Sequence, residues 1–381
     1  MGSRGRVGSV IGGKWRVDRQ IGRGGTSSVY AAVHAAVGYR VAVKILNTQA
    51  SQSMKQRDRF LREGKLANRI DHEGVIKIID NGVTAEGRPY LIMELLEGEN
   101  LDDRRHKNDD GCLPFDEVID LTLRVADILA AAHDAGLVHR DVKPSNVFLT
   151  RNGGVKLLDF GLAGYRQRDE DKTRTGAGCG TPLFMAPEQL TGDDCIDARA
   201  DVFALAAMVY RLLSGRYPYA GQSVVEYARS LLMGPTPPRL DTMGIDVDVE
   251  LANVIATALA IDPKERFADA RVFATAVKDA IDVRSKRRET LLLPTPPSSR
   301  NTFGQIDTVI MRPQQLRTAP MAPISMPVPP PPSSSPIPTP ISSSVPAVHV
   351  PRPPKASWLP ALIALGLSLG LLVGCASVLV R

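Results

Sequence analysis

The residues best suited to chemistry in this chain gather in the short segment 139–146, which reads His-Arg-Asp-Val-Lys-Pro-Ser-Asn. Asp141 is placed to accept a proton from a hydroxyl, and Lys143 follows two residues later as a cation for phosphate. Asn146 offers an amide oxygen, and Asp159 opens an Asp-Phe-Gly triplet further along the chain. An amide and a carboxylate side by side would form a magnesium site of hard oxygen ligands.

Two further patterns precede this segment. Residues 22–29 read Gly-Arg-Gly-Gly-Thr-Ser-Ser-Val, and glycines let backbone amides approach phosphate oxygens closely. Alone this pattern is weak, because glycine-rich turns between strands are common. Lys44 lies inside an apolar strand pattern, where an unpaired ammonium is costly, and Glu63 is the partner we expect. Taken alone, Lys44 could equally be a surface lysine.

The elements that position these residues fall into two halves. The first half is small and rich in β-structure, with one helix over residues 55–69. Its expected strands cover residues 15–17, 29–33, 41–46, 76–79 and 90–93. The second half begins with a long amphipathic helix from Val118 to Ala132. Two strands, at 146–149 and 155–158, and helices at 202–213, 224–233, 251–260 and 270–280 follow. This α+β arrangement predicts a ligand cleft between the halves.

In order and spacing these motifs, together with Ala-Pro-Glu at residues 186–188, resemble the eukaryotic-type protein kinase family, especially its bacterial serine/threonine members. The resemblance covers residues 15–282. It implies a bilobal kinase fold and transfer of the ATP γ-phosphate to Ser or Thr hydroxyls of proteins. Mg²⁺ is the implied metal, with Mn²⁺ as an alternative.

The resemblance also assigns individual residues. Asp141 is the implied catalytic base, Lys143 the residue that steadies the transferred phosphate, and Asn146 and Asp159 the metal ligands. Lys44, held by Glu63, would grip the α- and β-phosphates. The residues implied in ATP binding are Ile21, Gly22, Arg23, Gly24, Gly25, Thr26, Ser27, Ser28, Val29, Ala42, Lys44, Glu63, Met93, Glu94, Leu96 and Phe148. Among them, Ala42 and Phe148 would sandwich adenine, Met93 would be the gatekeeper, and residues 94–96 the hinge.

Structural roles are implied as well. His139 and Phe160 would be buried packing residues, Asp201 would brace the catalytic loop, and Glu188 would form a buried ion pair with Arg266. Ser27 replaces the third glycine of the loop, a departure from the family pattern that we expect to have slight effects on ATP affinity. Serine/threonine preference rests on Lys143 and on Thr181, which resembles the residue that bonds the catalytic Asp and Lys.

The segment 162–185 is the implied activation loop. Kinases of this type usually order this loop by pairing a phosphate with the arginine before the catalytic aspartate, here Arg140. Thr173 and Thr175 are the expected autophosphorylation sites. The alternative is that they are ordinary loop threonines.

The composition changes after residue 282. Residues 283–357 are rich in proline and serine, which predicts a disordered linker, either a tether or a docking arm for proline-recognising partners. Residues 358–380 carry no charge and would span ~34 Å as a helix, enough for a ~30 Å hydrocarbon core. With Arg352 and Lys355 before this helix, we expect a single-pass membrane protein with a cytoplasmic kinase domain. Glycine spacing at residues 366–374 suggests a homodimer.

Net charge and cysteine content argue against some classes of function and some kinds of site. The net charge of +6 is a weak signal over 381 residues, and no nucleic-acid module is visible, so we expect no nucleic-acid partner. The four cysteines suggest neither a zinc site nor a disulfide framework. The rival interpretations are a pseudokinase scaffold that binds partners at a membrane, a small-molecule kinase of the same fold, and an adaptor acting through its proline-rich arm.

Overall fold

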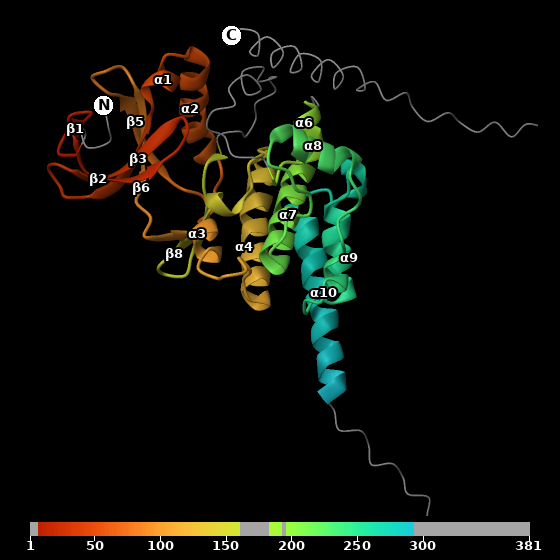
Figure 1. Cartoon of the computed structure of the whole chain (residues 1–381). Helices are drawn as coiled ribbons and strands as arrows, with labels where there is room; N and C mark the ends of the chain where they lie inside the picture. The colour runs from red at the N-terminus through yellow and green to blue at the C-terminus, as the bar shows by residue number, and fades with distance from the viewer. Residues whose placement is uncertain (1–6, 161–182, 193–195, 293–381) are drawn as a thin grey trace, which may run out of the picture. The chain divides into compact units, whose positions relative to one another are not determined.

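The computed structural model describes residues 7–160, 183–192 and 196–292, and the side chains of these residues up to Arg287. They form one compact unit with a β-rich half and a helical half (Figure 1). The expected α+β arrangement of two halves is therefore confirmed.

An antiparallel sheet of six strands builds the first half, in the order β1-β2-β3-β4-β6-β5. Its strands are β1 (Val10–Ile11), β2 (Trp15–Arg23), β3 (Ser27–His34), β4 (Arg40–Leu46), β5 (Ile78–Val83) and β6 (Pro89–Glu94). Alternating burial along β2 leaves one of its faces to solvent, whereas β4 and β6 are almost wholly buried. A short helix α1 (Thr48–Ser51) precedes α2 (Met54–Ala67), which packs against β5 and β6.

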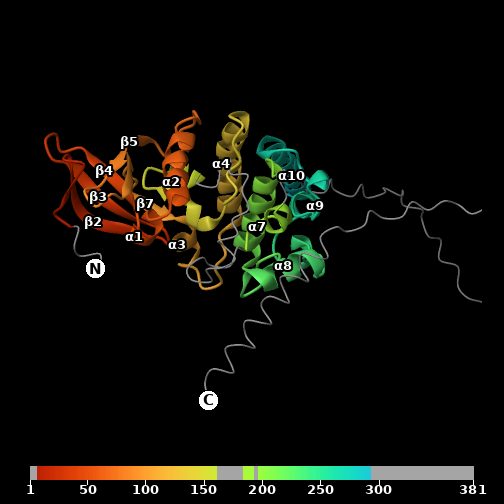
Figure 2. The ribbon, with the colours of Figure 1, turned by 90° about the horizontal axis from the view of Figure 1, so that it is seen from above.

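The helical half is organised around α7 (Arg199–Ser214), in which every residue from Ala200 to Tyr210 is buried. α4 (Phe115–Asp134) and α10 (Ala270–Leu292) pack beside it, as both views show (Figures 1 and 2). The other helices of this half are α3 (Leu101–Arg105), η2 (Pro144–Asn146), α6 (Pro187–Thr191), α8 (Val224–Met233), η4 (Leu240–Thr242), α9 (Val249–Ala258) and η5 (Pro263–Glu265).

A second, smaller sheet lies beside the segments that carry Asn146 and Asp159. Its three antiparallel strands are β7 (Gly98–Asn100), β8 (Val147–Thr150) and β9 (Val155–Leu157), in that order. β8 directly follows η2, and Leu157 forms an isolated bridge to Val75, which lies in the loop between α2 and β5 of the first half. The segments carrying Asn146 and Asp159 are thus held by one tight hairpin.

The expected elements are present with different limits. The pattern predicted a helix over 270–280, but α10 continues to Leu292, beyond the expected end of the folded region at 282. The continuation is anchored, because Arg284 pairs with Asp246 and Asp248 at 2.6 and 2.7 Å and lies over the ring of Phe115. β1, β7 and α3 are too short to produce a periodic pattern and were not predicted.

The expected membrane location requires correction. In the part of the chain that the structure describes, no helix is both long and apolar enough to cross a membrane. Residues 358–380, on which that expectation rested, and the proline-rich segment 293–357 lie outside the described residues.

Candidate active site

Lys44 is held by two carboxylates between the halves of the molecule. It lies on β4, buried between β3 and β6, and its Nζ donates to Glu63 Oε1 at 2.6 Å and to Asp159 Oδ1 at 2.7 Å. Glu63 comes from α2, so the predicted contact between Lys44 and Glu63 is confirmed. The contact with Asp159 was not predicted, and it ties the β-rich half to the Asp-Phe-Gly segment.

The protonation of this cluster follows from burial and from the opposite charges. Burial alone would lower the pKa of Lys44, but the adjacent Asp159 and Glu63 carboxylates outweigh it, and the pKa is raised. Burial also acts to raise the pKa of Asp159, yet the Lys44 ammonium holds that pKa below its ordinary value. For Glu63 burial dominates and raises the pKa. Lys44 therefore remains a cation at neutral pH.

Asp141 lies in a tight hydrogen-bonded arrangement with the two residues predicted beside it. Lys143 Nζ donates to its two carboxylate oxygens at 3.0 and 2.7 Å. Asn146 Nδ2 donates to the Asp141 carbonyl at 2.7 Å and to its Oδ2 at 3.0 Å. Pro144 at the start of η2 fixes the backbone turn that folds Asn146 back. Spacing alone thus identified a set of residues that the fold brings together.

Asp201 braces this segment from the first turn of α7. Its fully buried carboxylate accepts the backbone N–H groups of His139 at 2.8 Å and Arg140 at 2.7 Å. His133 Nε2 lies 2.9 Å from the same carboxylate, a partner that sequence reasoning missed. Arg140 has a φ of +66°, a left-handed conformation that is costly without such support. The predicted bracing role of Asp201 is confirmed.

Two predicted packing residues are buried as expected. His139 and Phe160 are 0% and 1% exposed, and their rings meet edge to face with centroids 4.6 Å apart. His139 also contacts the Leu158 carbonyl through Nε2 at 2.9 Å. Next to Phe160, the backbone of Asp159 has a left-handed φ of +61°, a strained conformation beside a fully packed side chain.

The glycine-rich segment forms the turn between β2 and β3. Gly22 pairs with Val29 across the hairpin, and Gly24 N–H donates to the Ser27 carbonyl at 2.8 Å. The side chain of Asn47 stabilises this turn, because its Nδ2 donates a hydrogen bond to the carbonyl of Gly25 at 3.2 Å. No sequence pattern singled out Asn47. The hairpin also carries the other predicted ATP-binding residues Ile21, Arg23, Thr26 and Ser28.

The predicted adenine-binding residues come from three strands. Ala42 and Met93 are cross-strand partners on β4 and β6, and both are buried. Glu94 ends β6, and its carboxylate accepts from Lys156 Nζ at 2.8 Å, which orients the start of the hinge ahead of Leu96. Phe148 lies on β8, partly buried.

The donor set suits magnesium better than a transition metal. Among the described residues there is no cluster of three or more His, Cys, Asp or Glu side chains able to hold a metal. Asn146 uses Nδ2 for Asp141, which leaves its Oδ1 for a cation. One amide oxygen and the Asp159 carboxylate are few ligands, as expected for Mg²⁺, which keeps several waters and binds substrate phosphates.

The Ala-Pro-Glu segment is anchored to the helical half. Glu188 and Arg266 form a bidentate pair at 2.7 and 2.9 Å, almost completely buried, so this prediction is confirmed. Gln189 Nε2 donates to the Arg140 carbonyl at 2.9 Å and joins the segment to the catalytic loop. The expected phosphorylation sites Thr173 and Thr175, and Thr181, lie outside the described residues.

Comparison with known proteins agrees with this geometry. The protein kinase domain model matches residues 15–278. Similar curated proteins include the probable serine/threonine-protein kinase PknB of Corynebacterium glutamicum, 34% identical over 78% of this chain and 48% of that protein. Serine/threonine-protein kinase Pkn1 of Myxococcus xanthus is 35% identical over 82% of this chain and 48% of its own length. Serine/threonine-protein kinase PknA of Mycobacterium tuberculosis is 35% identical over 77% of this chain and 67% of its own length.

A solved structure shows the same fold. The PknI kinase domain of Mycobacterium tuberculosis superposes with a TM-score of 0.57 and 29% identity, covering 72% of this chain and 98% of that one. The chain spans about half the length of the curated relatives from Corynebacterium glutamicum and Myxococcus xanthus. With the motifs, the fold and the family model in agreement over most of its described residues, the chain belongs to the protein kinase domain family.

Proposed function

We propose that this protein is a serine/threonine protein kinase that transfers the γ-phosphate of ATP to Ser or Thr hydroxyls of proteins, its own included. The observation that carries the proposal is the Asp141–Lys143–Asn146 arrangement beside the Lys44–Glu63–Asp159 cluster. Together they supply a base, two cations and a pair of metal-ligand oxygens, the parts that phosphoryl transfer uses. Residues 15–282 would form the catalytic domain.

Each residue has a distinct task in this proposal. Asp141 orients the acceptor hydroxyl and takes its proton, and Lys143 neutralises charge on the transferred group. Lys44, kept protonated and aimed by Glu63, holds the α- and β-phosphates. Asn146 and Asp159 hold Mg²⁺, which supplies charge neutralisation to the phosphates when bound.

The nucleotide would lie under the β2–β3 hairpin. The amides of the Gly22–Gly25 turn cover the phosphates, and Ile21, Arg23 and the residues from Thr26 to Val29 line the hairpin. Ala42 and Phe148 enclose the adenine, Met93 limits its depth, and the backbone of residues 94–96 bonds its edge. ATP is the substrate, with Mg²⁺ as the metal and Mn²⁺ as an alternative.

The test is phosphoryl transfer by the purified full-length chain with labelled ATP and Mg²⁺. Asp141→Asn is the matched control, because asparagine keeps the shape and loses the base. We expect label on the protein and on a generic substrate, with a rate in the variant lower by about 10²–10⁴-fold. Equal labelling in both proteins would refute the role of Asp141 as the base, and no label in the wild type despite ATP binding would refute phosphoryl transfer and favour a scaffold.

Mass spectrometry of the labelled chain tests the acceptor sites. Thr173 and Thr175 are the expected positions, and their absence among the phosphorylated residues of active protein would reject that assignment. The homodimer remains a prediction, which sedimentation of the full-length chain would test.

A further inference from the structure

The side chain of Lys156 joins two segments that the proposed nucleotide site uses. Lys156 lies on β9, three residues before Asp159, and its Nζ donates to Glu94 Oε1 at 2.8 Å. Glu94 ends β6 and begins the proposed hinge, residues 94–96. The side chains of the two paired residues are only 17% and 27% exposed. Salt and water therefore weaken this ion pair less than they weaken a pair on the open surface.

The hinge is bonded to the β8–β9 hairpin at both of its ends. Residues 95–97 belong to no helix or strand, so their position depends on these bonds. At the first end, Glu94 N–H donates to the Lys77 carbonyl at 3.1 Å, and Lys77 N–H donates to Glu94 Oε1 at 2.8 Å. At the second end, the N–H of Arg151 in the hairpin turn donates to the Glu97 carbonyl at 2.8 Å. The second bond is made by the backbone, whereas the bond from the hairpin to Glu94 is made by one side chain.

The β8–β9 hairpin is the fixed partner in this arrangement. β9 pairs with β8 along its whole length, and Leu158 N–H donates to the Asn146 carbonyl at 2.8 Å. Within the hairpin, Lys156 is the cross-strand partner of Phe148, which is predicted to lie against adenine. Because backbone bonds already hold the hairpin, the ion pair positions the hinge relative to the hairpin and not the reverse.

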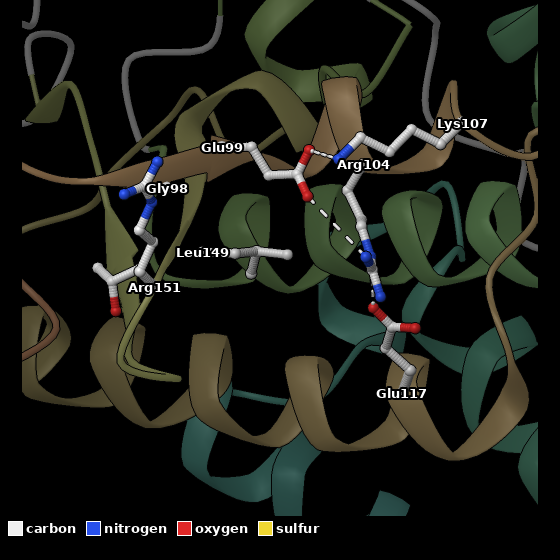
Figure 3. Close-up of a pocket in the computed structure, with 8 residues that line it drawn as sticks. Gly98, Glu99, Arg104, Lys107, Glu117, Leu149 and Arg151 are labelled. Carbon is white, nitrogen blue, oxygen red and sulfur yellow. Dashed lines mark hydrogen bonds and ion pairs between the residues drawn. The ribbon is translucent and has the colours of Figure 1, made fainter.

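A second group of ion pairs lies near the hinge but joins other elements. It lines a cavity of about 530 Å³ where α3 and α4 face β7 and β8 (Figure 3). Arg104 of α3 lies 3.1 Å from Glu117 of α4, and Lys107 pairs with Glu99 of β7. The side chains of Arg104 and Glu117 are 43% and 26% exposed. Their pair is a matched control, because it also joins two separate elements through one cation.

We propose that Lys156 is a positioning residue for adenine binding, because through Glu94 it sets where the hinge backbone lies relative to Phe148. The inference rests on the proposed kinase activity and adds to it a residue outside the predicted nucleotide-binding and metal-binding sets. A bond from an ammonium to a carboxylate is charge-assisted and therefore stronger than a neutral hydrogen bond. Loss of this bond should weaken adenine binding, whereas Asp141 and Lys143 keep their arrangement for phosphoryl transfer.

The test measures adenosine binding by calorimetry and ATP kinetics, both with the full-length chain. Adenosine carries the purine without phosphates, so its affinity reports on the hinge and not on the loss of a cation near the phosphates. Lys156→Met should raise the Kd for adenosine and the KM for ATP by a similar factor, about three- to tenfold. The kcat at saturating ATP should stay within about twofold of wild type, because the transfer residues are unchanged.

Two controls separate positioning from a general disturbance of the fold. Arg104→Met removes the control pair and should leave the adenosine Kd unchanged. Glu94→Gln combined with Lys156→Met should bind adenosine no more weakly than Lys156→Met alone, because both residues act through one ion pair. An unchanged adenosine Kd in Lys156→Met, or equal weakening in Arg104→Met, would overturn the inference. Adenosine binding that depends on Lys156 without any phosphoryl transfer would refute the proposed function alone, and a wild type that binds no adenosine would refute both.

Discussion

Replacing Glu188 by Gln should destabilise the helical half strongly. Arg266 is fully buried, and besides both Glu188 oxygens it donates to the carbonyls of Ala260 at 2.7 Å, Ile261 at 3.0 Å and Arg199 at 3.2 Å. Glutamine keeps one acceptor but points an N–H₂ group at a guanidinium, so a buried charge loses its counter-ion. Such a loss costs about 3–5 kcal/mol, a large part of a typical total stability of about 5–15 kcal/mol.

Thermal and urea unfolding of the full-length chain would measure this cost. A domain of this size loses roughly 2–4 °C per kcal/mol, so the melting temperature should fall by roughly 6–20 °C. Glu97→Gln is the control, because Glu97 and its partner Arg40 are 55% and 56% exposed and such pairs contribute about 0–1 kcal/mol. If Glu188→Gln cost no more than this surface control, the argument from burial would be refuted.

Three further predictions concern activity, pH and packing. Glu63→Gln should lower kcat/KM for peptide phosphorylation by about 10–100-fold, because a charge-assisted bond to Lys44 is lost; a rate within twofold of wild type would contradict this. Burial raises the pKa of Tyr219 to about 12, whereas the pKa of a tyrosine in the unfolded chain is about 10. The unfolded state therefore loses this proton at a lower pH than the folded state. As a result, the free energy of unfolding should fall as pH rises from about 10 to about 12. Tyr219→Phe should show a shallower fall when urea unfolding is compared at pH 9 and pH 11, and identical slopes would exclude Tyr219 as a contributor. Gly98→Ala should cost at least about 2 kcal/mol in urea unfolding, since a methyl group would meet the Leu149 carbonyl oxygen at 1.9 Å and φ is +151°. Gly87, at φ +76° and with open space around an added methyl group, gives the control Gly87→Ala, and equal costs would reject the steric argument.

Local patterns predicted much of the fold, because an element that buries one face carries apolar residues at a regular spacing. The alternating burial of β2 and the spacing of Val118 to Ala132 each report one face of one element. Elements of two to five residues, such as β1, β7 and α3, are too short to show such a regular spacing of apolar residues. The end of α10 was placed too early, because its last described turns are held by Arg284 and distant acids rather than by an apolar stripe.

The sequence by itself determined the family, the order of the motifs and the Asp141–Lys143–Asn146 set, because one local turn is enough to bring together residues so close along the chain. Only the tertiary structure decided which distant groups complete the site. Asp159 reaches Lys44, and Asn47 fastens the glycine-rich turn, through packing of separate elements. The pairing of Lys156 with Glu94 likewise depends on where the β8–β9 hairpin lies relative to β6, which no local pattern encodes.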